Sequence, residues 1–189
     1  MAEVLLFHHA HGRTPGFLAF ADELRAAGHA VHAPDLYDGA VFATLDEGVG
    51  YAKRVGFDTI LENGRLAAEG LPNELVYAGF SLGVMPAQLL AQTRPGAEGA
   101  LLFSAALPAS EFGGPWPQGV PLQIHMMEGD EWAVEDLPAA RELLDEADRA
   151  ELFLYPGDRH LFADSSLPDY DEAATRLLMQ RVLGFLKDI

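Results

Sequence analysis

Short apolar stretches of strand length alternate along this chain with longer segments of helical periodicity. The six strand-like stretches span residues 3–9, 29–33, 74–78, 99–104, 121–127 and 151–155. Helices are expected over residues 15–28, within 51–69, and over 82–93, 137–150 and 169–187, whereas residues 35–50 have the mixed composition of a loop. Parallel strands need crossover connections, which are usually helices. The alternation therefore predicts an α/β fold with a mostly parallel, doubly wound sheet of about six strands flanked by helices.

The size of the chain indicates one domain. It has 189 residues, of which 49% are hydrophobic, enough to bury one substantial core but short for two. We therefore expect a single domain over residues 1–189. No irregular stretch is long enough to form a separate cap domain, so a shallow and open site is expected.

The charge and residue usage exclude several classes of function. Acidic residues outnumber basic ones by 29 to 12, and no Lys/Arg cluster could neutralise phosphates, so nucleic acid and membrane are not expected partners. The chain has no cysteine, which excludes disulfides, thiolate metal sites and a cysteine nucleophile.

No signal peptide or transmembrane segment is recognisable, which predicts a cytoplasmic protein. Either a monomer or a homodimer is compatible with the sequence.

The pentapeptide GFSLG, residues 79–83, directly follows a predicted strand and precedes a predicted helix. A serine on such a sharp turn projects its hydroxyl above the sheet, and flanking glycines avoid clashes in the turn. The start of the following helix supplies N–H groups where an oxyanion would develop. Ser81 is therefore a candidate nucleophile, although a simple helix cap would also fit the pattern.

A serine nucleophile needs a histidine base oriented by a carboxylate. Enzymes with a serine on this kind of turn carry serine, acid and histidine in that chain order, each after a strand. Here EGDEW follows the strand at 121–127 and presents Asp130, while PGDRHLF follows the strand at 151–155 and presents His160. Other acids compete with Asp130 for this role, namely Glu128, Glu131, Glu135 and Asp136. His125 lies within a strand and is expected to be structural.

With these motifs and the N-terminal segment LLFHHAHGRTPGFLAFADELRAAGHAVHAPDLYDG, the chain resembles the dienelactone hydrolase family of the α/β-hydrolase superfamily. The resemblance covers nearly the whole chain. It implies an α/β-hydrolase fold, with Ser81 as nucleophile, Asp130 as orienting acid and His160 as general base. It also implies an oxyanion hole made by the backbone N–H groups of Ala10 and Leu82. The substrate would be a small ester or lactone, with no cofactor and no metal.

Three positions depart from the family pattern. The namesake enzymes have a cysteine nucleophile, a glutamate at the position of His9 and an arginine near the position of Asp164. An acid at Asp164 would repel a substrate carboxylate, so dienelactone itself is predicted to be a poor substrate.

The histidines of the segment FHHAHGRTPG pose a separate question, because three lie within four positions. On a strand, His8 and His9 would point to opposite faces and could not easily share a metal ion. We expect His8 to be buried and satisfied, and we expect substrate-pocket roles for His9, His11, Trp132 and Phe80. Trp116 is either a pocket residue or part of the core.

The sequence thus favours a serine hydrolase for small carboxylic esters or lactones. A thioesterase or an acyltransferase would use the same triad. From a different class of function, a catalytically silent α/β-hydrolase fold could serve as a binding protein.

Overall fold

The computed structural model describes all 189 residues and contains one six-stranded parallel sheet. The strands are β1 (Glu3–Phe7), β2 (Ala30–His32), β3 (Val76–Phe80), β4 (Gly99–Phe103), β5 (Leu122–Met127) and β6 (Ala150–Tyr155). Their order across the sheet is β2-β1-β3-β4-β5-β6, and every neighbouring pair is parallel. The predicted fold class is confirmed, and no cap domain is evident.

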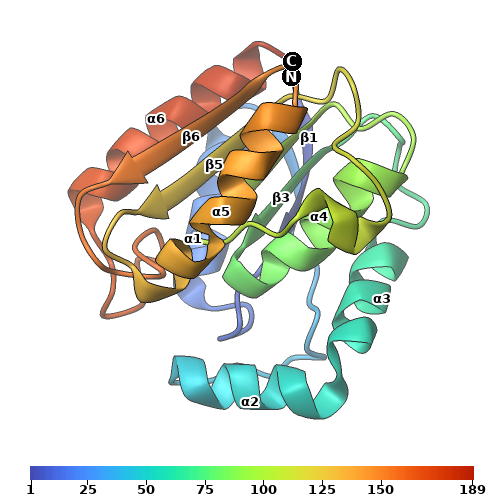
Figure 1. Cartoon of the computed structure of the whole chain (residues 1–189). Helices are drawn as coiled ribbons and strands as arrows, with labels where there is room; N and C mark the ends of the chain where they lie inside the picture. The colour runs from blue at the N-terminus through green and yellow to red at the C-terminus, as the bar shows by residue number, and fades with distance from the viewer.

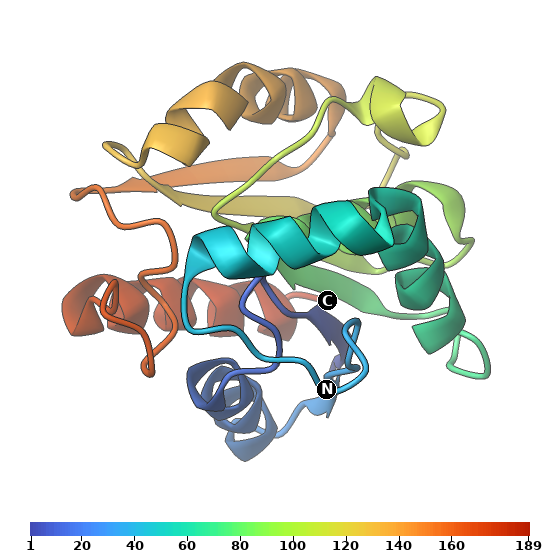
Figure 2. The same ribbon diagram turned by 90° about the horizontal axis from the view of Figure 1, so that it is seen from below.

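Helices cover both faces of the sheet (Figures 1 and 2). They are α1 (Pro15–Ala26), α2 (Leu45–Val55), α3 (Phe57–Ala67), α4 (Val84–Thr93), α5 (Glu131–Glu146) and α6 (Glu172–Lys187), with short 3-10 turns η1 (Ser81–Gly83) and η2 (Ala109–Phe112). One hydrophobic cluster lies between the sheet and α3, α4 and α5, and a second lies between the sheet and α1 and α6. No helix is both long and apolar enough to cross a membrane.

The strand order reverses between β1 and β3, because the chain passes from β1 to β2 on one side and then to β3 on the other. Loops that leave the carboxyl ends of two such strands diverge and leave room for a ligand between them. The histidine-rich segment follows β1, and Ser81 follows β3. Both therefore lie at the switch point of the sheet.

Several predicted boundaries were wrong. The strand over residues 3–9 ends at Phe7, so His8 and His9 belong to the loop, and β3 continues to Phe80 where a turn was expected. The expected loop over residues 35–50 contains the first half of α2, whose N-cap Thr44 forms a capping box with Glu47. The region 51–69 holds the end of α2 and the whole of α3, which meet at Gly56.

The helix expected over residues 137–150 begins at Glu131 instead. In the structure Pro138 lies inside α5, and Asp130 is the N-cap residue. This correction matters for the site, because it places Asp130 at the start of a helix rather than inside a longer loop.

Candidate active site

Ser81 lies on a sharp turn between β3 and α4. Its φ of 48° is in the left-handed region, which a residue with a side chain adopts only at a cost. A Cβ atom on Gly79 would lie 2.1 Å from the carbonyl oxygen of Gly83. A Cβ atom on Gly83 would lie 2.5 Å from the carbonyl oxygen of Phe7. The turn therefore requires glycine on both sides of Ser81, and it brings the β3–α4 turn against the end of β1.

The predicted Ser81, His160 and Asp130 come together in space. Ser81 Oγ lies 2.7 Å from His160 Nε2, and His160 Nδ1 lies 2.7 Å from Asp130 Oδ2. The other oxygen of Asp130 accepts a hydrogen bond of 3.1 Å from the backbone N–H of Trp132, which anchors the carboxylate to the start of α5. His160 and Asp130 are both buried. The three side chains form a continuous line of contacts from hydroxyl to carboxylate.

None of the competing acids takes this place. Asp136 Oδ2 accepts a hydrogen bond from the backbone N–H of Ala106. Burial raises the pKa of Asp136 above its ordinary value, although the Ala106 contact opposes the shift. Glu128, Glu131 and Glu135 are not buried, and no hydrogen bond joins them to His160. Asp130 is therefore the carboxylate in position to orient the imidazole.

The loop after β1 brings Ala10 to the same place. The carbonyl oxygens of Phe7 and His8 pack against Gly83, so the beginning of this loop touches the turn that carries Ser81. The backbone N–H of Ala10 has no hydrogen-bond acceptor within the chain. Leu82 directly follows Ser81 in η1. These are the two N–H groups for which the family resemblance implies an oxyanion hole.

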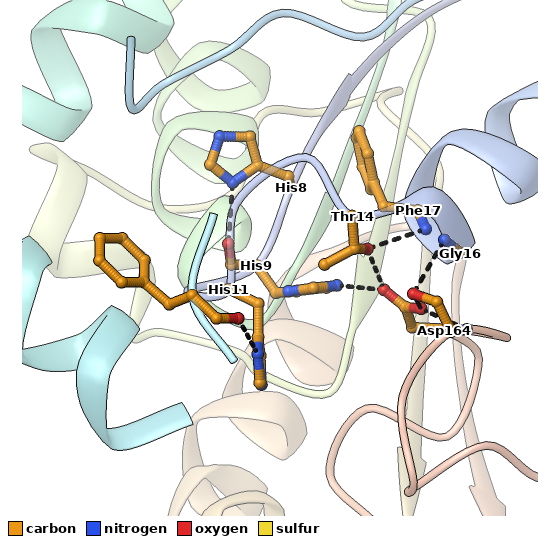
Figure 3. A network of polar contacts seen from close by, with 9 residues as sticks. His8, His9, His11, Thr14, Gly16, Phe17 and Asp164 are labelled. Carbon is orange, nitrogen blue, oxygen red and sulfur yellow. Dashed lines mark hydrogen bonds and ion pairs between the residues drawn. The ribbon is translucent and has the colours of Figure 1, made fainter. Parts of the chain in front are cut away.

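The three histidines of this loop have separate partners (Figure 3). His8 Nδ1 lies 2.8 Å from the carbonyl oxygen of His9, and His11 Nδ1 lies 3.0 Å from the carbonyl oxygen of Phe42. His9 Nε2 lies 2.8 Å from Asp164 Oδ2. No group of three or more His, Asp or Glu side chains is arranged to hold a metal ion.

Asp164 is buried and is not a free acid in a pocket. Its carboxylate accepts hydrogen bonds from His9, from the hydroxyl of Thr14, and from the hydroxyl and backbone N–H of Ser166 (Figure 3). Burial works to raise the pKa of Asp164, but these hydrogen bonds outweigh it and lower the pKa to about 2. The expected contact between Asp164 and a substrate carboxylate is therefore not available, because this acid is buried and its oxygens are occupied by donors of the chain itself.

Burial favours the neutral form of His9 in this pair. Burial lowers the pKa of His9 below its ordinary value, even though Asp164 favours the charged form. Because Asp164 is ionised, Nε2 of His9 carries the proton and donates it. His9 Nδ1 is buried and has no hydrogen-bond partner. The second histidine-carboxylate pair thus ends in an unpaired nitrogen rather than a hydroxyl.

Of the other predicted pocket residues, only Trp132 is open to solvent. Its side chain is 49% exposed, and its ring centroid lies 5.8 Å from that of His160. A surface hollow of about 210 Å³ lies against Trp132, Glu131 and Glu135. Phe80 instead packs in the core against Phe103, so its predicted pocket role is wrong. Trp116 is also buried in the core, where it donates a hydrogen bond to the carbonyl of Val120.

The model of the dienelactone hydrolase family matches residues 1–189, the whole chain. The chain belongs to the dienelactone hydrolase family. The resemblance inferred from the motifs is therefore confirmed, and the protein is a dienelactone hydrolase-like α/β hydrolase, consistent with ester or lactone hydrolysis. Among curated protein sequences, none matches this chain.

Several solved structures share the fold at low sequence identity. A protein named m3DLH is 18% identical with a TM-score of 0.79, and the match covers 100% of this chain and 86% of that one. A dienelactone hydrolase-like promiscuous phosphotriesterase from metagenomic libraries is 20% identical, with a TM-score of 0.73 and the same coverage. A dienelactone hydrolase from Anabaena variabilis is 17% identical with a TM-score of 0.73, also over 100% and 86% of the chains.

Sequence reasoning missed the network around the β1 loop. Thr14 caps α1 by accepting from the backbone N–H of Phe17 at 3.1 Å, and its hydroxyl also donates to Asp164. Ser166 completes the set of donors to that carboxylate. From the sequence, the place of Thr14 before Pro15 indicates only a helix cap, because its second partner lies 150 positions further along the chain. No local pattern marks such a contact.

Proposed function

We propose that this protein is a serine hydrolase that cleaves small, uncharged carboxylic esters or lactones through an acyl-enzyme intermediate. The observation that carries the proposal is the line of contacts from Ser81 through His160 to Asp130, with 2.7 Å at each step. A serine hydroxyl, an imidazole and a buried carboxylate in this order form the arrangement that activates a serine for acyl transfer.

In the first half of the reaction, Ser81 Oγ attacks the ester carbonyl carbon while its proton passes to His160 Nε2. The carbonyl oxygen becomes an oxyanion, which accepts hydrogen bonds from the N–H groups of Ala10 and Leu82. The bond to the alkoxide then breaks, and the alkoxide takes the proton from His160. Asp130 stays ionised and holds the imidazole in the required tautomer.

In the second half, a water molecule gives a proton to His160 Nε2 and attacks the acyl carbon. The bond to Ser81 Oγ breaks, and His160 returns the proton to that oxygen. The products are a carboxylic acid and an alcohol, or a hydroxy acid when the substrate is a lactone. No group besides the triad and the two N–H donors is needed for this cycle.

The charge around the site supports a neutral substrate. The only strongly exposed aromatic side chain near His160 is Trp132, and the hollow beside it is lined by Glu131 and Glu135. A substrate carboxylate entering there would meet two acidic side chains on a chain with a net charge of −17. Poor turnover of dienelactone is therefore still expected, with these two residues as its cause rather than Asp164.

Labelling and hydrolysis together test this proposal. The protein is incubated with a fluorophosphonate, the labelled residue is found by mass spectrometry, and hydrolysis of p-nitrophenyl acetate is measured. We expect a label on Ser81, and loss of both labelling and hydrolysis in Ser81→Ala. A folded protein that neither takes the label nor cleaves the ester would reject the proposal and favour a binding protein.

Two further assays define the reaction. Hydrolysis rates are compared for neutral esters, for thioesters and for dienelactone, and products are analysed with an alcohol added as a competing acceptor. We expect neutral oxygen esters to have the highest kcat/KM and water to be the main acceptor. An equal kcat/KM for dienelactone would contradict the proposed charge preference, and preferred transfer to the alcohol would assign an acyltransferase instead.

A further inference from the structure

His8 is buried beside the proposed oxyanion loop and makes two hydrogen bonds of opposite kind. Its Nδ1 lies 2.8 Å from the carbonyl oxygen of His9, and its Nε2 accepts from the backbone N–H of Leu36 at 2.9 Å (Figure 3 shows the first contact). A carbonyl oxygen only accepts and a backbone N–H only donates. These two contacts therefore require a neutral ring with its proton on Nδ1.

The surroundings of the ring keep it in this state and this place. Burial lowers the pKa of His8 from 6.5 to about 4, so the ring is neutral at neutral pH. Its centroid lies 4.9 Å from that of Tyr37 and 6.0 Å from that of Phe17, both in edge-to-face geometry. The side chain is fully buried, and side chains in such close-packed surroundings have little freedom to move.

The carbonyl that His8 holds belongs to the same peptide unit as the N–H of Ala10. This carbonyl also accepts from the backbone N–H of Gly12 at 3.0 Å, so two donors fix its direction. A trans peptide is planar, and its N–H points opposite to its C=O. A fixed His9 carbonyl therefore fixes the direction of the Ala10 N–H, which has no acceptor of its own within the chain.

We infer that His8 is a positioning residue for the hydrolysis proposed above: by holding the His9 carbonyl, its Nδ1–H aims the Ala10 N–H at the oxyanion. The inference rests on the proposed function, because it needs a reaction in which an oxyanion forms. His8 itself touches neither Ser81 nor the substrate. Its effect should appear in the transition state, where the oxyanion exists, and much less in substrate binding.

Two substitutions separate the two hydrogen bonds. In His8→Asn the amide nitrogen stands where Nδ1 stood and can still donate to the His9 carbonyl, but nothing reaches Leu36. In His8→Gln the side-chain oxygen can reach the backbone N–H of Leu36, but no donor remains at the position of Nδ1. The pair therefore keeps the residue polar while it removes one contact at a time.

The test measures kcat and KM for p-nitrophenyl acetate, with active sites counted by fluorophosphonate labelling. It also measures inhibition by phenylboronic acid, because the adduct of this acid with Ser81 is a tetrahedral anion that resembles the oxyanion. Removal of an oxyanion donor costs about 10²- to 10³-fold in kcat, and misdirection of one should cost less. We expect His8→Gln to lower kcat and boronic acid affinity by roughly 10- to 100-fold with KM little changed. His8→Asn should stay within about threefold of the wild type in both.

A kcat that is unchanged in His8→Gln, or reduced as much in His8→Asn as in His8→Gln, would overturn the inference. His125→Gln serves as the matched control, because His125 is another fully buried imidazole but lies within β5. It should alter the melting temperature without altering kcat per labelled site.

The wild-type protein gives an independent test that does not depend on how the variants fold. Nitrogen NMR of ¹⁵N-labelled histidine distinguishes the two neutral tautomers, and the signals of His8 should show the proton on Nδ1. A proton on Nε2 would overturn the inference. If the wild type is neither labelled at Ser81 nor active, the proposed function fails and this inference fails with it; an active wild type with an unaffected His8→Gln rejects the role of His8 alone.

Discussion

Two buried histidine-carboxylate pairs lie at the carboxyl end of the same sheet, and only one of them contacts a serine hydroxyl. His160 and Asp130 are 2.7 Å apart, and His9 and Asp164 are 2.8 Å apart. His160 uses Nδ1 for the carboxylate and presents Nε2 to Ser81, whereas His9 uses Nε2 for the carboxylate and leaves Nδ1 unpaired. The comparison teaches that a carboxylate partner can bury and orient an imidazole in either of two ways, and that only a ring with a hydroxyl at its other nitrogen is in position to act as a base.

The largest difference is expected when the imidazole rings are removed by substitution of the histidines with alanine. His160→Ala should lower kcat by about 10⁴- to 10⁶-fold, because no base remains for Ser81. The double variant His9→Ala, His11→Ala should lose less than about 100-fold, since these rings hold the loop but transfer no proton. Rates on p-nitrophenyl acetate, divided by the number of folded molecules from circular dichroism, decide the matter. If the double variant were as inactive as Ser81→Ala, the two pairs would not differ as described.

Replacement of each carboxylate by an amide sharpens the comparison. Asp130→Asn should lower kcat by about 10³- to 10⁴-fold with little loss of stability, because Asn also caps helices well. Asp164→Asn should lower the free energy of unfolding by about 3 kcal/mol, since it replaces a buried carboxylate that accepts four hydrogen bonds, one of them from His9. Its kcat per folded molecule should change less than about tenfold. Urea unfolding and steady-state kinetics on both variants measure these effects, and a reversal of the two patterns would contradict the assignment.

Burial disfavours the charged form of two other imidazoles, His8 and His125, and the pH dependence of stability should reflect this. Burial lowers the pKa of His8 to about 4 and that of His125 to about 3. Below pH 6.5 these two rings bind protons in the unfolded chain but not in the folded chain. Their contribution to the free energy of unfolding is therefore complete above that pH and declines as the pH falls. The lowered pKa of His8 alone should reduce the free energy of unfolding by about 3 kcal/mol between pH 6.5 and pH 4.

Urea unfolding at a series of pH values between 7 and 4 checks this decline. His125→Gln removes one of the rings that resist protonation, so its stability should fall less over the same range. A decline as steep as that of the wild type would show that His125 is not held neutral by the fold.

The smallest effects are expected where a single donor to Asp164 is removed. Ser166→Ala should lower the free energy of unfolding by about 1 kcal/mol, and Thr14→Ala by about 1 to 2 kcal/mol because it also removes the cap of α1. Thr14→Ser keeps both hydrogen bonds and should remain within about 0.5 kcal/mol of the wild type. The kcat should stay within about twofold in all three. Thermal melting and kinetics test this ranking, and a loss of activity without a loss of stability would link Asp164 to the chemistry directly.

The sequence allowed prediction of the parts that depend on local pattern. Apolar runs and helical periods indicated all six strands and the doubly wound sheet. The position of each candidate residue after a strand indicated Ser81, Asp130 and His160, because parallel strands bring their carboxyl ends to one edge. The place of Thr14 before Pro15 likewise indicates a helix cap, and Thr14 is the N-cap residue of α1.

The features that the sequence did not predict depend mainly on contacts between residues that are far apart in the chain. His9 and Asp164 are separated by 155 positions, and no periodicity relates them. The start of α2 escaped for a different reason, since Gly48 and Gly50 obscured a helix that Thr44 and Glu47 in fact signal with a capping box. Phe80 was misjudged because closeness to Ser81 in sequence does not decide whether a side chain faces the site or the core.

The contact between α2 and the β1 loop has a consequence for anyone who wishes to redesign this protein. A Cβ atom at Gly48 would lie 2.0 Å from the carbonyl oxygen of Ala10, so on this side main chain packs directly on main chain. No side chain there can be exchanged to widen the site or to reshape it for a bulkier acyl group. Mutant libraries aimed at substrate range should therefore leave position 48 fixed and concentrate on the start of α5, where Trp132 is exposed and surrounded by open surface.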